Sequence, residues 1–313
     1  MKRGQFFERI PTALAFLVMS MLSVESLAQS VPHAAGIAHT ADVDLAYETF
    51  GARGASLAVI AVNGGPGLSH AYMMQNDLWE RVGKGHFVVL YDQRGTGKSK
   101  PVKDGAAQTM EAQVADLDAV RAALKLDKVA LVGDSYGGML SMAYAVAHPE
   151  HVVRLVLSDS PPPEWKTMVH LLPDVFPDME ESGAAEEKKL GEGTDAAEQA
   201  GLRNHFRMIF YSPELRDAYM AKMGDLGFEP AVAGAVSKSA GEMDLTAQVK
   251  EFHFPVLVIT GRYDMNVAPL NAWRMAHEIP GAKIVFFEKS GHLPAYEEPE
   301  KYLSVLNGFL NEK

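Results

Sequence analysis

The chain has 313 residues, of which 47% are hydrophobic and 22% charged, and its formal net charge is −11. This length and composition suit one large domain or a domain with an insertion, and a surface this acidic repels phosphate backbones, so nucleic acid is not an expected partner. The absence of cysteine excludes disulfides, thiol catalysis, cysteine-ligated metals and an acylated lipoprotein anchor.

The start of the chain has the three parts of a secretory signal peptide. Basic residues open it, residues 12–22 form an uncharged apolar run, and Ser26-Leu27-Ala28 offers small residues to a signal peptidase. We predict a signal peptide over residues 1–28, and a periplasmic or secreted mature chain without stable membrane association. The apolar run is shorter than the about 20 residues that a transmembrane helix needs; an uncleaved N-terminal anchor is the alternative.

The next part of the chain predicts a sheet. Residues 29–40 lack a period and are interpreted as a linker, whereas residues 41–50 alternate and predict a half-buried strand. Continuous apolar runs closed by turn residues then follow at 57–62, 87–91, 129–132, 152–157, 255–259 and 284–287. Helix-period stretches lie between them at 110–124, 139–147 and 270–278. Such runs are typical of parallel strands buried on both faces, so we expect an open, mostly parallel α/β sheet flanked by helices.

One long segment breaks this alternation. Residues 161–253 begin with three prolines, continue through an acidic stretch and include a helical pattern over residues 202–223. We interpret the segment as an inserted helical cap over the carboxyl ends of the strands, where α/β sheets gather their reactive groups. The α/β core then comprises residues 29–160 and 254–313.

A nucleophile motif follows one of the predicted strands. Gly133-Asp134-Ser135-Tyr136-Gly137 has the pattern G-x-S-x-G between an apolar strand and a helix-like stretch, which is the context that this motif requires. The turn exposes the serine hydroxyl, and the N-terminus of the following helix stabilises developing negative charge. Ser135 is therefore the predicted nucleophile.

A serine hydroxyl needs a base, and the base needs a carboxylate to orient it. In chain order the acid and then the histidine follow the serine in this type of site. His292 follows the last predicted strand, and Asp264 directly follows the strand before it. We predict His292 as the base and Asp264 as the acid; Asp159, which ends an earlier strand, is the competing acid.

Two backbone N–H groups are needed to stabilise a tetrahedral oxyanion. One is predicted at Tyr136, the residue after the nucleophile, and the other in the Gly64-Gly65 turn, where we choose Gly65. A nearby Gly97-Lys98-Ser99 ends like a phosphate-binding P-loop, but that motif requires a glycine where Asp92 stands. The P-loop interpretation therefore fails, and a nucleotide-binding protein is not expected.

Five motifs occur in order: Gly64-Gly65-Pro66-Gly67, Asp92-Gln93-Arg94-Gly95-Thr96-Gly97-Lys98-Ser99, Gly133-Asp134-Ser135-Tyr136-Gly137-Gly138, Gly261-Arg262-Tyr263-Asp264 and Gly291-His292. Together they resemble the proline iminopeptidase family of α/β-hydrolase serine peptidases. The resemblance implies the α/β-hydrolase fold, a triad of Ser135, Asp264 and His292, and oxyanion donors at Gly65 and Tyr136. The sequence departs from the family at Asn63, where the family has His, and within the nucleophile motif, where Asp134 and Tyr136 replace Gly and Trp.

The resemblance also implies how substrate is recognised, because peptidases of this family bind the free N-terminal amine with carboxylates of the cap. The glutamates that could do so here are Glu180, Glu181, Glu186, Glu187 and Glu214. A solvated helix face is the alternative for each of them.

The chemistry expected from these residues is acyl transfer to water through an acyl-serine intermediate. The expected enzyme is an aminopeptidase or amidase acting on a small molecule or short peptide, and neither a metal nor an organic cofactor is required. A carboxylesterase or lactonase is the alternative within the fold, and a non-catalytic binding protein is the alternative of another class.

Overall fold

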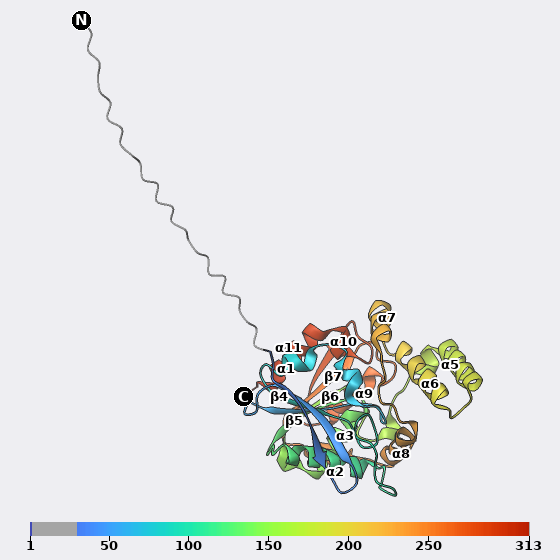
Figure 1. Cartoon of the computed structure of the whole chain (residues 1–313), viewed down its shortest axis with the longest axis horizontal. Coiled ribbons are helices and arrows are strands. Elements are labelled where there is room, and N and C mark those ends of the chain that lie inside the picture. The colour runs from blue at the N-terminus through green and yellow to red at the C-terminus, as the bar shows by residue number, and fades with distance from the viewer. Residues whose placement is uncertain (2–29, 313) are drawn as a thin grey trace. The chain divides into compact units, whose positions relative to one another are not determined.

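A computed structural model describes Met1 and residues 30–312 (Figure 1). The predicted signal peptide therefore lies outside the described residues, apart from Met1. The described residues from Val31 onward form one compact unit. Within the described part of the chain, no helix has the length and apolar character needed to span a bilayer.

The core of the unit is an eight-stranded sheet with the strand order β1-β2-β4-β3-β5-β6-β7-β8. The strands are β1 (His33–His39), β2 (Asp44–Phe50), β3 (Ala58–Val62), β4 (Phe87–Tyr91), β5 (Val129–Asp134), β6 (Val152–Ser158), β7 (Val256–Gly261) and β8 (Lys283–Phe287). The pairs β1–β2 and β2–β4 are antiparallel, and all other neighbouring strands pair in parallel. The predicted fold class, a mostly parallel sheet built from continuous apolar runs, is confirmed.

The linker predicted over residues 29–40 is wrong, because His33–His39 forms the edge strand β1 and pairs antiparallel with β2. Most of this strand is solvent-exposed, and among its residues only Ala38 is buried. Small residues exposed at a sheet edge leave no hydrophobic alternation in the sequence, so the signal that identifies most strands is missing here.

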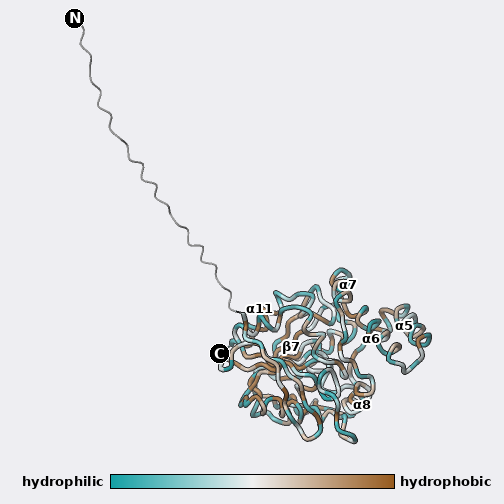
Figure 2. The backbone as a smooth tube through the Cα atoms, in the orientation of Figure 1, coloured by the Kyte–Doolittle hydropathy of each residue, from teal (hydrophilic) through white to brown (hydrophobic). Residues whose placement is uncertain are grey.

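Helices cover both faces of the sheet. Helices α2 (Met110–Ala123), α3 (Tyr136–Ala147) and α9 (Pro269–Glu278) share one hydrophobic cluster with one face, which includes Ile60 and Val62 of β3. Helices α1 (Leu78–Val82) and α11 (Pro299–Leu310) share another with the opposite face, which includes Val59 and Ala61. Figure 2 shows hydrophobic residues along strand β7. Burial on both faces explains why these strands lack polar alternation.

The segment between β6 and β7 is helical. It contains η3 (Trp165–Thr167), α4 (Leu172–Val175), α5 (Pro177–Leu190), α6 (Asp195–Met208), α7 (Pro213–Lys222), α8 (Pro230–Gly241) and η4 (Gln248–Glu251). Helices α5 and α6 lie side by side away from the sheet (Figure 1). A third hydrophobic cluster joins α6 and α7 to Leu68, Tyr72 and Leu293, which belong to loops of the sheet. The insertion thus packs on the loops that carry the candidate site.

Candidate active site

Ser135 occupies a sharp turn between β5, which ends at Asp134, and α3, which begins at Tyr136. Its backbone has φ +51° and ψ −126°, a conformation that a residue with a side chain rarely adopts. The turn is closely packed, since a Cβ on Gly137 would lie 2.1 Å from the carbonyl oxygen of Val62. Glycine is required there because any side chain would push the turn away from β3.

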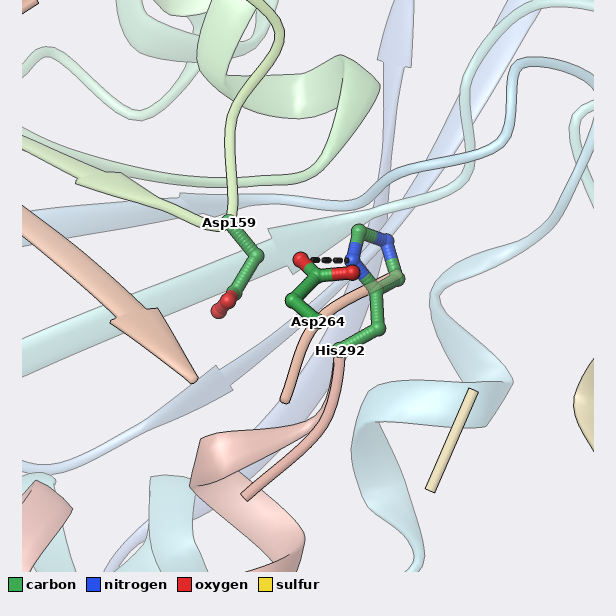
Figure 3. A group of neighbouring side chains, drawn as sticks. All are labelled: Asp159, Asp264 and His292. Carbon is green, nitrogen blue, oxygen red and sulfur yellow. Dashed lines mark hydrogen bonds and ion pairs between the residues drawn. The ribbon is translucent and has the colours of Figure 1, made fainter. Parts of the chain in front are cut away.

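Ser135, His292 and Asp264 form one hydrogen-bonded series. The Ser135 Oγ lies 3.0 Å from His292 Nε2. His292 Nδ1 lies 2.7 Å from Asp264 Oδ2, the contact drawn as a dashed line in Figure 3. A carboxylate can only accept, so Nδ1 carries the proton and Nε2 is left to accept from the serine hydroxyl. The other oxygen of Asp264 accepts the backbone N–H groups of Asn266 and Val267, each at 2.9 Å. The acid is therefore fixed at both oxygens.

The loop that carries His292 is held by the insertion and by a glutamate that the sequence analysis did not single out. The His292 N–H donates to the carbonyl of Ile209 at 2.7 Å. Glu297 accepts the N–H of Gly291 at 2.7 Å through one carboxylate oxygen, and through the other it accepts the N–H groups of Tyr211 and Ser212. Its signal in the sequence was weak because it follows the histidine motif without any pattern of its own.

Asp159, the competing acid, lies beside Asp264 but points elsewhere (Figure 3). Its carboxyl accepts the N–H of Gly261 at 2.8 Å and the hydroxyl of Ser158 at 3.1 Å. Burial, and then the charge of Asp264, raise the pKa of Asp159 well above its usual range. Asp159, Asp264 and His292 offer ligand atoms within 4.8 Å of one another, but protein donors and the serine already occupy the atoms concerned. His292 and Asp264 are therefore arranged as a hydrogen-bonded relay with Ser135, and Asp159 is not part of it.

Opposing effects set the protonation of the histidines. Burial lowers the pKa of His292, but the carboxylates of Asp264 and, less strongly, Asp134 raise it more, so that its pKa lies above the usual value. Burial raises the pKa of Asp134 to about 6. Burial and two neighbouring histidines lower the pKa of His205, on α6, to about 4. His205 is therefore a neutral imidazole at neutral pH, whereas the pKa of His292 is shifted in the opposite direction.

The turn that follows β3 lies against Ser135. A Cβ on Gly64 would lie 2.8 Å from Cβ of Ser135, so only glycine allows this approach. The Gly64 N–H donates to the Tyr72 hydroxyl at 2.6 Å, and the Gly65 N–H makes no hydrogen bond to the described residues. Gly65 also lines the pocket of Ser135. The geometry thus favours Gly65 over Gly64 as a free donor, beside the N–H of Tyr136 that begins α3.

The pocket above Ser135 is mostly apolar. Leu68 and Leu293 come from loops of the sheet, and Phe206 and Ile209 from the insertion. Among the described residues that line it, Asp134 contributes the one carboxylate. The five glutamates considered for binding an amine, Glu180, Glu181, Glu186, Glu187 and Glu214, do not line it. They lie on α5 and α7, and each of them is exposed or half-buried at the surface of the insertion.

Comparison with known proteins places this geometry among related chains. A family model described as alpha/beta hydrolase fold matches residues 58–299. The chain is 30% identical to a proline iminopeptidase of Lacticaseibacillus rhamnosus, over 84% of this chain and 93% of the relative. It is 31% identical to a proline iminopeptidase of Lactobacillus delbrueckii subsp. bulgaricus, over 80% and 89%.

Solved structures give the same fold at lower identity. An alpha/beta fold family hydrolase from Bacillus anthracis aligns with a TM-score of 0.70 and 18% identity, over 88% of this chain and 99% of that one. A thermophilic esterase from Thermogutta terrifontis aligns with a TM-score of 0.65 and 24% identity, over 89% and 98%. These likenesses support the fold alone.

Proposed function

The chain belongs to the proline iminopeptidase family of α/β hydrolases, and from this premise we propose that it is a serine hydrolase in which Ser135 is the nucleophile, His292 the base and Asp264 the acid. The observation that carries the proposal is the continuous series from the Ser135 hydroxyl through both ring nitrogens of His292 to a fully buried carboxylate. The chain is a hydrolase, so a non-catalytic binding protein is not favoured.

The reaction would proceed in two halves. His292 Nε2 accepts the proton of Ser135 as the oxygen attacks the substrate carbonyl, and Asp264 stabilises the imidazolium that forms. The N–H groups of Gly65 and Tyr136 would hold the oxyanion. The imidazolium then protonates the leaving group, and water, activated by the same histidine, hydrolyses the acyl-serine. No step requires a group beyond the side chains and backbone described.

We assign an N-terminal aminoacyl group as the substrate class, with proline preferred. Curated relatives at about 30% identity, aligned over most of both chains, are proline iminopeptidases. The apolar lining from Leu68, Phe206 and Leu293 suits a compact ring such as the pyrrolidine of proline. A neutral His205 could accept a hydrogen bond from the substrate's amine without repelling its charge.

A carboxylesterase or lactonase is the second candidate. The observation in its favour is the lining of the pocket, to which none of the five cap glutamates contributes. The one carboxylate that lines the pocket, that of Asp134, already accepts a hydrogen bond from Tyr72. A cationic amine would therefore lose solvation there for limited compensation, whereas a neutral acyl ester would lose less. The structural neighbours include an esterase.

A chromogenic panel separates the two candidates. Mature protein would be assayed with proline and alanine arylamides, their N-acetylated forms, and short acyl esters, with Ser135→Ala as the control. Arylamide cleavage that needs a free amine and is lost in Ser135→Ala supports the aminopeptidase. Ester cleavage alone supports the second candidate. If a fluorophosphonate fails to label folded wild-type protein at Ser135, the nucleophile assignment is wrong.

We also propose that residues 1–28 direct export and that the mature enzyme works in the periplasm or outside the cell. The basic start, the apolar run and the small residues at the predicted cleavage position support this proposal. Fractionation of expressing cells, followed by N-terminal sequencing, tests it. A mature protein that begins at Gln29 is expected, and full-length protein retained in the cytosol would contradict export.

A further inference from the structure

A buried tyrosine–aspartate pair lies directly behind the nucleophile. The Tyr72 hydroxyl, on the short helix η1 (His70–Met74), donates to Asp134 Oδ2 at 2.5 Å. Asp134 is the residue before Ser135, at the end of β5. Both residues are buried, with 6% and 7% of their surface exposed. The mechanism proposed above uses neither of them.

The same hydroxyl reaches the turn that carries the predicted oxyanion donor. Tyr72 Oη accepts the Gly64 N–H at 2.6 Å while donating to Asp134. One oxygen therefore ties the Gly64–Gly65 turn to the strand end that carries Ser135. The Gly64 N–H is used by this hydrogen bond to Tyr72. The Gly65 N–H makes no hydrogen bond to the described residues, so it remains available to a substrate in the pocket of Ser135.

We propose that Tyr72 and Asp134 are positioning residues that hold the Gly65 N–H in register with Ser135, so that the oxyanion donor and the nucleophile keep a fixed relation. The inference rests on the proposed function, because it assigns these residues to the same acyl-transfer reaction. A displacement of about 1 Å at such a donor costs on the order of a hundredfold in rate. The two short hydrogen bonds resist that displacement.

The tyrosine is itself held from several sides. Ser69, just before η1, donates through its N–H and its hydroxyl to the carbonyl of Leu226 in the insertion, at 3.0 and 2.7 Å. The Tyr219 hydroxyl donates to the carbonyl of Tyr72 at 3.3 Å. Because the backbone around Tyr72 is fixed, its hydroxyl stays in one place and can hold the Gly64–Gly65 turn there. A mobile side chain could not do this.

The pair also has an electrostatic effect that a merely structural contact would lack. The titratable groups that face His292 are Asp264, Asp134 and, from the insertion, the neutral His205. The Tyr72 hydrogen bond favours the charged form of Asp134, and that charge raises the pKa of His292. Removing the hydroxyl should let Asp134 take up a proton more readily, and the pKa of His292 should then fall.

The test compares Tyr72→Phe with Tyr296→Phe. Tyr296 lines the same small cavity behind Asp134, so its variant controls for loss of one hydroxyl from that cavity. Rates would be expressed per active site, titrated with a fluorophosphonate. For Tyr72→Phe we expect kcat to fall about tenfold to a hundredfold with KM nearly unchanged, and the acid limb of kcat/KM to move to lower pH. Tyr296→Phe should show neither change.

A second pair of variants keeps the proposal testable if Tyr72→Phe fails to fold. Asp134→Asn retains an acceptor for the Tyr72 hydroxyl and Asp134→Ala does not, so kcat should fall at least fivefold further in Asp134→Ala, by the cost of misplacing a donor. Asp134→Asn should also shift the acid limb to lower pH. A Tyr72→Phe enzyme with wild-type kcat and an unshifted limb would overturn the inference. Wild-type protein that neither labels nor hydrolyses would instead overturn the proposed function.

Discussion

Replacing Asp264 by asparagine is the sharpest test of the relay, because the structure fixes how the amide must turn. One oxygen of Asp264 accepts from His292 Nδ1, and the other accepts two backbone N–H groups, those of Asn266 and Val267. If the new NH2 faced the backbone, two buried donors would lose their acceptor, at about 1–3 kcal/mol each. The NH2 should therefore face His292.

That orientation reverses the tautomer of the imidazole. A donor opposite Nδ1 requires Nδ1 to be an acceptor, so the proton moves to Nε2, where it faces the hydroxyl of Ser135. The histidine can then no longer accept the serine proton, and we expect kcat to fall about ten-thousandfold, or about 5.5 kcal/mol. KM should change little, because Asp264 is fully buried and lies behind the histidine.

The assay is steady-state hydrolysis of the best substrate from the panel, with thermal unfolding followed in parallel. Asp159→Asn is the matched control: the carboxyl of Asp159 accepts from Gly261 and Ser158 and not from His292, so the rate should stay within about fivefold. A rate for Asp264→Asn within tenfold of wild type, with a large loss in Asp159→Asn, would refute the assignment of the acid.

Three further outcomes are expected. The acid limb of kcat/KM should have its midpoint above about pH 6.5, because the base must be neutral and the pKa of His292 is raised; a midpoint below pH 6 in a pH–rate profile would contradict this. Gly64→Ala should lower kcat about a hundredfold by displacing the turn from Ser135, as steady-state kinetics would measure. Arg94→Leu should cost about 3–5 kcal/mol in urea unfolding, since it leaves Asp116 buried without its partner.

Sequence patterns predicted the sheet well wherever a strand is buried on both faces. The run at 87–91 coincides with β4 and the run at 129–132 lies within β5, since each residue of these two strands is buried. The same rule explains the failure at β1, whose partner is β2 and whose side chains mostly face solvent. Backbone pairing holds that strand, and pairing leaves no mark in composition.

The relay could be predicted because its members have motifs, whereas their supports do not. Ser135 and His292 stand at fixed places after strands, so chain order and turn chemistry identify them. Tyr72 and Glu297 act through hydrogen bonds whose partners include groups far away in the sequence, Asp134 for Tyr72 and the N–H of Tyr211 for Glu297. Such contacts depend on the folded path of the insertion and the loops, and a single sequence contains no period or spacing that reports them.

Substrate selection and catalysis depend on two different parts of the chain, the insertion and the sheet. The loops after the strands of the sheet carry the proposed nucleophile, its proposed base and the proposed oxyanion turn. The insertion supplies His205 and Phe206 to the pocket, and it also holds the backbone around His292 through the carbonyl of Ile209. A change in the packing of α6 would therefore alter substrate fit and the placement of the base together. For this reason exchange of the insertion with that of a relative should change kcat as well as specificity, even with every residue of the relay intact.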